Sequence, residues 1–148
     1  MKAHIDCIFC DRLKLLNKDP FFIFENEHIA VFLGDHQFYR GYCIVVTKSH
    51  VRELFELKGN ESQTLMNCLK KVVEIIVEWY SPWKLNYSSF GNVIEHLHWH
   101  VIPRYDGDVN KLLNPWANAE RFSESPSMPV HANALQEAFK RFNDPIID

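Results

Sequence analysis

The fold of this 148-residue chain is decided by the stretch His96-Leu97-His98-Trp99-His100-Val101-Ile102-Pro103. Histidine and apolar residues alternate in it, and successive side chains of a β-strand point to opposite faces. The three imidazoles would therefore share one face, about 6.6 Å apart for each step of two residues. The side chains of Leu97, Trp99 and Val101 would point the other way, into a core. We expect a strand over 97–104 with a polar site on one face and a core on the other.

Three imidazoles in strict alternation favour a functional site over an ordinary sheet edge. Burying all three without partners would cost several kcal/mol, and a plain solvated face gives no reason for histidine three times. One strand cannot bring all three to a single ion, because zinc–nitrogen bonds are only about 2.1 Å long. At most one or two of them could share a metal with residues from elsewhere. The imidazoles that bind no metal suit nucleophilic and acid–base chemistry on a phosphate group, because a neutral imidazole attacks phosphorus without first losing a proton.

Length and composition limit the classes of protein that the chain can belong to. Its 148 residues fit one domain, and 47% hydrophobic residues supply enough apolar material for a core. The net charge of −3, with 16 basic and 19 acidic residues, argues against a nucleic-acid partner that binds through its phosphates. No apolar run approaches the roughly 18 residues of a membrane span. Residues 1–10 lack a long apolar segment, so we expect no secretory signal and a cytoplasmic location.

Hydrophobic spacing in the rest of the chain predicts an α+β fold in which one long helix covers a mostly antiparallel sheet. We expect helices over 11–17, 60–80 and 131–142, helical turns over 51–57, and strands over 21–25, 28–33, 42–47, 84–90 and 97–104. Residues 105–129 are polar and proline-dotted, with Trp116 as the one large anchor. The chain is predicted to be a single domain over 1–148, with its core over about 7–104 and a C-terminal tail and helix over 105–148.

The four cysteines divide into two kinds. Cys43 lies in an apolar run and Cys68 in a helical pattern, so both are expected to be buried small hydrophobes. Cys7 and Cys10 form a Cys-Ile-Phe-Cys pair, and two thiols three positions apart can bind one metal from a tight turn. By itself this pair is equally compatible with a metal site, a redox pair or coincidence.

The chain resembles the histidine triad (HIT) family, and in particular bacterial members described as diadenosine polyphosphate hydrolase-like. The family pattern of three histidines alternating with apolar residues is matched position by position over 96–102. The resemblance extends to Asn86, Gly91, Asn92, Pro103 and Arg104, to the segment 41–50 with its glycine, apolar strand and Lys-x-His, and to the cysteine pair. It implies a compact HIT-like α+β domain, usually a homodimer, that binds nucleotides and acts at their α-phosphate.

The resemblance also implies roles for individual residues. The middle histidine, His98, corresponds to the family nucleophile, which carries the nucleotidyl group until water releases it. His100 and the amide of Asn92 would face the phosphate oxygens. Asp35 resembles the acidic residue that accepts the ribose hydroxyls, and Asn86 resembles an asparagine near the nucleotide.

Zinc-bearing members of the family provide an interpretation of the cysteine pair. They join it to the histidine of the Lys-x-His segment and to the first histidine of the triad. The corresponding residues here are Cys7, Cys10, His50 and His96. Two thiolates and two imidazoles are a common closed set of ligands for structural zinc. The resemblance therefore implies a zinc ion that holds the N-terminal turn against the histidine strand and leaves His98 for chemistry.

Three positions depart from the family pattern. Asn92 stands where glutamine is more common, and Tyr42 stands where histidine is common. Val93 replaces a serine or threonine whose hydroxyl could protonate or hold the leaving group. These departures leave open a second function, a regulatory module that binds nucleotides with little turnover. A purely zinc-structured interaction domain is a third alternative, but it would leave His98 and His100 without a role.

Overall fold

The structure, a computed structural model, describes residues 6–126 and 128–141 and contains an antiparallel sheet with helices on both faces. The helices are α1 (Ile8–Lys14), α2 (Glu61–Tyr80) and α3 (Pro129–Arg141), with shorter 3₁₀ segments η1 (Leu16–Lys18), η2 (Leu54–Glu56) and η3 (Pro115–Glu124). The strands are β1 (Phe22–Glu25), β2 (Ile29–Leu33), β3 (Cys43–Thr47), β4 (Lys84–Ser88) and β5 (His98–Arg104), in the order β1-β2-β3-β5-β4. This architecture confirms the predicted α+β class.

The middle strand of the sheet, β3, fixes the position of β5, the strand that carries the histidines. Every residue of β2 and β3 is buried, as their continuous apolar sequences predict. β3 pairs with β5 so that Ile44 lies opposite His100 and Val46 lies opposite His98. Directly opposed residues share a face of the sheet. The pairing therefore anchors both imidazoles to a strand that is buried along its whole length.

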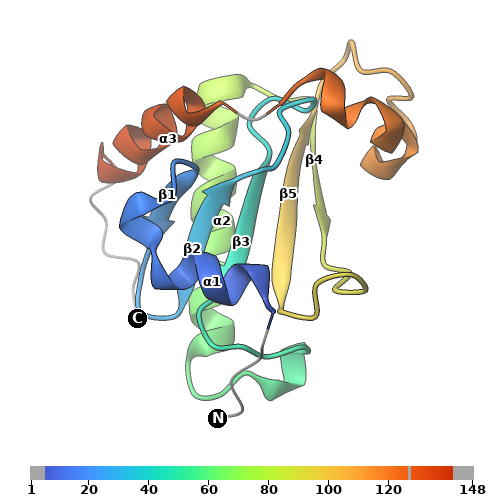
Figure 1. The fold of residues 1–148 in the computed structure, drawn as a ribbon. Coiled ribbons are helices and arrows are strands. Elements are labelled where there is room, and N and C mark those ends of the chain that lie inside the picture. The colour runs from blue at the N-terminus through green and yellow to red at the C-terminus, as the bar shows by residue number, and fades with distance from the viewer. Residues whose placement is uncertain (1–5, 127, 142–148) are drawn as a thin grey trace.

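Different segments cover the two faces of the sheet (Figure 1). The long helix α2 lies behind the sheet with α3 beside it, and their apolar side chains pack on one face. The core residues of that face include Val31, Val45, Leu69, Val72, Ile76, Val101 and Leu135. α1 crosses the opposite face, where the core includes Phe9, Leu16, Phe32, Tyr42, Ile44 and Ile102. The second face is therefore the one that carries the histidines.

The first helix begins earlier than the sequence predicts, at Ile8 instead of Asp11. Cys7 is its N-cap residue, and its sulfur accepts a hydrogen bond from the backbone N–H of Cys10 at 3.5 Å. A thiol is not one of the usual helix-capping groups, so sequence rules gave no signal for it. The cysteine pair thus lies within the first turn of α1 and not in a loop ahead of it.

The tail is more regular than the sequence predicts. η3 forms within it because the side chain of Asn114 accepts a hydrogen bond from the backbone N–H of Trp116 at 3.0 Å. α3 follows and extends to Arg141, and the expected helix end at Phe142 lies outside the described residues. Of the helices in the described ranges, none has the length and apolar character needed to cross a bilayer.

Gly34, which follows β2, yields a test of this packing. A Cβ atom added there would lie 2.1 Å from Cδ1 of the buried Tyr42 ring, far inside contact distance. We therefore expect Gly34→Ala to lower the free energy of unfolding by about 2 kcal/mol or more, since overpacking forces the ring to move. Urea unfolding monitored by circular dichroism measures this loss.

Gly107→Ala is the matched control. A Cβ atom at Gly107 would meet nothing within 4 Å, so its effect should stay within about 0.5 kcal/mol. Equal losses in the two variants would contradict the close packing of Tyr42 against Gly34.

Candidate functional site

Two cysteines and two histidines from separate parts of the chain converge at one end of the sheet. Cys7 and Cys10 lie at the start of α1, His50 follows β3, and His96 precedes β5. Their four ligand atoms all lie within 4.8 Å of one another. Nδ1 of His96 is 3.4 Å from the sulfur of Cys7 and 3.5 Å from that of Cys10, and Nδ1 of His50 is 3.1 Å from Cys10. The structure thus brings together all four predicted metal ligands.

The chemistry of this cluster fits a metal ion. Ligand atoms around a tetrahedral zinc lie about 3.3 to 3.8 Å apart, given its usual bond lengths, and the distances above are close to this range. Nε2 of His96 is 2.6 Å from the carbonyl oxygen of Thr47. A carbonyl only accepts, so this nitrogen carries the proton and Nδ1 presents its lone pair to the cluster. The four residues therefore form a Cys₂His₂ set that could hold a metal.

The thiol of Cys10 favours its neutral form as long as no cation is present. Burial, together with the neighbouring thiol of Cys7, raises the pKa of Cys10 to about 11. A thiolate is the form that binds metal, so a metal must displace protons to bind here. Metal binding at the cluster should consequently weaken as the pH falls.

His98 lies two residues further along the strand and is held in one tautomer. Its Nδ1 is 2.6 Å from the carbonyl oxygen of His96, so Nδ1 carries the proton and donates it. Nε2 then has a free lone pair, and the structure gives that atom no hydrogen-bond partner among the described residues. The ring is mostly buried and packs against Phe9 of α1, with centroids 4.8 Å apart. This arrangement fixes the ring and leaves the lone pair of Nε2 available.

His100 is the next imidazole on the same face, and its ring centroid is 5.0 Å from that of His98. Its Nδ1 is 2.6 Å from the hydroxyl oxygen of Tyr42. Burial, with further contributions from His98 and His36, lowers the pKa of His100 to about 4. His100 is therefore neutral at pH 7.

A cavity of about 390 Å³ opens beside these two imidazoles. Its lining consists of Phe90, Gly91, Asn92, Val93, Ile94, His98, His100 and Trp116. The indole of Trp116, from η3, meets His100 edge-on at 5.1 Å between centroids. The structure thus joins three of the predicted site residues, His98, His100 and Asn92, around one cavity.

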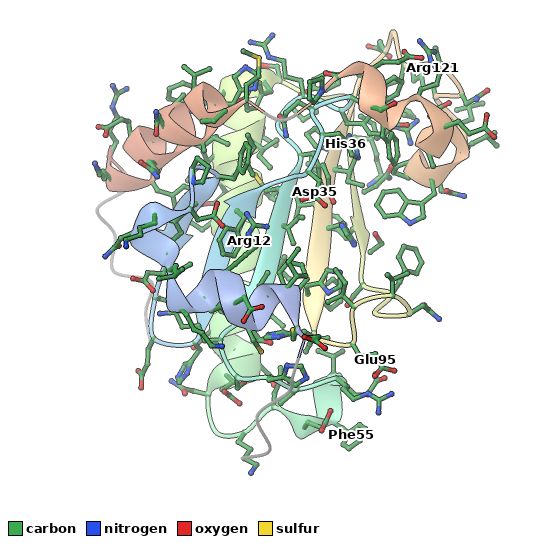
Figure 2. All side chains as sticks on the ribbon, viewed as in Figure 1. Arg12, Asp35, His36, Phe55, Glu95 and Arg121 are labelled. Carbon is green, nitrogen blue, oxygen red and sulfur yellow. The ribbon has the colours of Figure 1, made fainter. Side chains whose placement is uncertain are left out.

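The other two predicted nucleotide ligands lie elsewhere. Asp35 is exposed at the end of β2 and lines a second cavity of about 550 Å³, together with Ile8 and Arg12 of α1. Figure 2 shows Asp35 next to His36, with Arg12 close by. Asn86 lies on the histidine face of β4, but its side-chain oxygen accepts a hydrogen bond from Arg104 at 3.1 Å. Their roles toward a nucleotide stay predictions.

Sequence reasoning assigned no role to several residues that contact the imidazoles. Phe9 lies between the two cysteines, and nothing in the sequence signals its contact with His98. In the structure, His36 stacks on Phe122 at 3.9 Å and lies 4.9 Å from Tyr42. Tyr42 did carry a signal, because it stands where the family usually has histidine. The others depend on contacts between segments that the sequence alone does not place.

Comparison with known proteins identifies the family. The model of the HIT domain matches residues 16–107, which is more than half of the chain. The chain belongs to the HIT family. Because the match ends at residue 107, the tail with Trp116 and Phe122 lies beyond the part that the family model describes.

Relatives and solved structures agree with this membership. An uncharacterized HIT-like protein of Methanocaldococcus jannaschii is 32% identical over 69% of this chain and 81% of its own length. The AP-4-A phosphorylase of Mycobacterium tuberculosis strain H37Rv is 29% identical over 69% of this chain and 55% of its own. A crystal structure of a zinc-bound histidine triad family protein from Mycobacterium smegmatis superimposes with a TM-score of 0.69 at 19% identity, covering 93% and 96% of the two chains. The last comparison supports the HIT fold.

Proposed function

We propose that this HIT protein is a nucleotide phosphohydrolase or nucleotidyl transferase that acts at the α-phosphate of adenosine nucleotides. Dinucleoside polyphosphates and nucleoside phosphoramidates are the substrate classes that we expect. The observation that carries this proposal is the free lone pair on Nε2 of His98. The hydrogen bond from Nδ1 to the His96 carbonyl fixes this tautomer, and the ring lines a cavity. The relative named AP-4-A phosphorylase supports a nucleotide polyphosphate as the substrate class.

The proposed reaction has two steps. Nε2 of His98 attacks the α-phosphorus and forms a nitrogen–phosphorus bond, while the bond to the leaving group breaks and its electron pair departs with that group. His100 and Asn92 line the same cavity and would hold the phosphate oxygens as charge builds on them. Water then attacks the nucleotidyl-histidine, and the nucleoside monophosphate leaves with His98 restored. Val93 supplies no hydroxyl, so the leaving group would take its proton from solvent.

Replacing the nucleophile tests this function. We expect His98→Ala to lower kcat on diadenosine tetraphosphate or adenosine 5′-phosphoramidate about a thousandfold or more, because no other group forms the covalent intermediate. Binding of a non-hydrolysable adenosine nucleotide should change little, since the rest of the cavity stays in place. Product formation is followed by chromatography, and binding by calorimetry.

His28→Ala is the control, because this imidazole contacts Asn60 and does not line the cavity. Its kcat should equal that of the wild-type protein. Unchanged turnover in His98→Ala would contradict the proposed mechanism. Tight nucleotide binding without turnover by the wild-type protein would instead favour the alternative function, a regulatory module that binds nucleotides.

We also propose that the metal of the Cys₂His₂ cluster is zinc and that its role is structural. Cys7, Cys10, His50 and His96 would use up all four tetrahedral positions, leaving none for substrate. When bound, the ion would neutralise the thiolates and join α1 to the entrance of β5. The ligand type supports zinc, since two thiolates with two imidazoles are a soft set that suits it.

Metal analysis tests the cluster. Freshly purified protein should contain about one zinc per chain, and chelator treatment should lower Tm by about 5 °C or more, because zinc stabilises only the folded state. Cys10→Ser should lose the metal. The control Cys68→Ala removes a buried thiol of α2 that lies outside the cluster, and it should keep the zinc. Wild-type protein without zinc would contradict this assignment.

We further propose that the protein is a homodimer that associates through β4 and α2. β4 is an edge strand. Next to it is an apolar groove of about 280 Å³ whose lining includes Met66, Val73, Tyr87 and Trp99. Nε1 of Trp99 is buried there and has no hydrogen-bond partner among the described residues. A second copy would cover this groove and the open strand edge.

Tyr87→Glu tests the interface, since Tyr87 is 51% exposed at the groove. A charge placed there should convert the dimer to a monomer at micromolar concentration, as measured by light scattering after gel filtration, because it would be buried unpaired. Phe55→Glu alters another exposed aromatic side chain, which lies on η2 away from β4, and should leave the dimer intact. A dimeric Tyr87→Glu variant would contradict this interface.

A further inference from the structure

We propose that the hydroxyl of Tyr42 holds His100 in the tautomer that carries its proton on Nε2, so that His100 offers a hydrogen-bond donor to the phosphate attacked by His98. The catalytic consequence of this inference rests on the proposed function. The position of the proton on His100 does not depend on it. Tyr42 is in this sense a positioning residue, because it acts through His100.

The position of Tyr42 is closely constrained. The residue immediately precedes β3 and is 3% exposed. Its ring lies over Gly34, where a Cβ atom would come within 2.1 Å, and its backbone carbonyl accepts a hydrogen bond from the Gly34 N–H at 2.8 Å. His36 packs against the ring at 4.9 Å between centroids. The hydroxyl therefore reaches His100 from a fixed ring.

The direction of the hydrogen bond follows from the available partners. The hydroxyl oxygen of Tyr42 is 2.6 Å from Nδ1 of His100, and the structure gives this hydroxyl no other partner among the described residues. Burial, with a smaller contribution from Asp35, raises the pKa of Tyr42 well above its usual value, so the phenol keeps its proton. With no other acceptor for that proton, the hydroxyl donates to Nδ1. A neutral imidazole then carries its own proton on Nε2.

His98 and His100 thus become opposite tautomers although they are the same residue type on the same face. The Nδ1 partner of His98 is a carbonyl, which accepts, whereas the Nδ1 partner of His100 is a hydroxyl, which donates. His98 is left with a lone pair on Nε2, and His100 is left with a proton there. A phosphate site needs both the lone pair of His98 and the proton of His100. A lone pair on Nε2 of His100 would repel the phosphate oxygens, whereas a proton there can bind them.

The proton position can be measured without substrate. Long-range ¹H–¹⁵N spectra separate protonated ring nitrogens from those with a lone pair, and they should show His100 protonated on Nε2 in the wild-type protein. In Tyr42→Phe, which keeps the ring and removes the hydroxyl, this preference should fall by about tenfold, the effect of one ordinary hydrogen bond on an equilibrium. Tyr105→Phe is the matched control, because its hydroxyl donates to the backbone carbonyl of Arg40 and not to one of the triad imidazoles.

Kinetics then test the consequence. Tyr42→Phe should lower kcat by about tenfold at nearly unchanged KM, because the donor acts on charge that develops in the transition state, and Tyr105→Phe should match the wild type. A wild-type His100 protonated on Nδ1, or the same tautomer preference in wild type and Tyr42→Phe, would overturn the inference. The predicted tautomers in a protein that hydrolyses no tested nucleotide would support the proton position and contradict only the proposed function.

Discussion

The site depends on the three hydrogen-bonding directions of a single residue, His96. Its Nε2–H donates to the carbonyl of Thr47 at 2.6 Å, which ties the start of β5 to the end of β3. Its Nδ1 faces the sulfurs of Cys7 and Cys10. Its backbone carbonyl accepts a hydrogen bond from Nδ1–H of His98, with 2.6 Å between the nitrogen and the oxygen. Any shift of this ring would therefore move the cysteine turn and rotate His98 together. The Cys₂His₂ cluster and the imidazole of His98 are thus coupled through one residue.

This coupling explains why the cysteines belong to α1. Because Cys7 caps the helix and Cys10 closes its first turn, Phe9, one of the two residues between them, is directed at the ring of His98. The cluster thus fixes an aromatic side chain on one side of His98 while the carbonyl of His96 fixes its Nδ1. Packing and hydrogen bonding together restrict the ring to one orientation. A ring that is preorganised in this way would lose little conformational freedom in the proposed reaction.

The parts of the molecule that could be predicted from sequence are those in which apolar residues recur at the short spacing of a strand or a helix. Alternation over 96–100 predicts a strand with one histidine face, and apolar spacing over 60–80 predicts the long helix. Partners distant along the chain carry no such pattern: Tyr42 and His100 are 58 residues apart. The tautomer of His98 depends on a backbone carbonyl, which every residue has, so no residue identity signals it. In the tail, the role of Trp116 depends on which strand end η3 packs against.

Identical side chains obtain different chemistry here from the atom that each Nδ1 meets. For His96 that atom is a cysteine sulfur, for His98 a carbonyl oxygen, and for His100 a hydroxyl oxygen. These atoms belong to different segments, namely the N-cap of α1, the residues just before β5 and the residue just before β3. Replacing Tyr42 would therefore change the partner of His100 and leave the Nδ1 partners of His96 and His98 in place. The same reasoning explains how a tyrosine can stand where the family commonly has histidine, since what His100 requires at this position is a proton donor at its Nδ1.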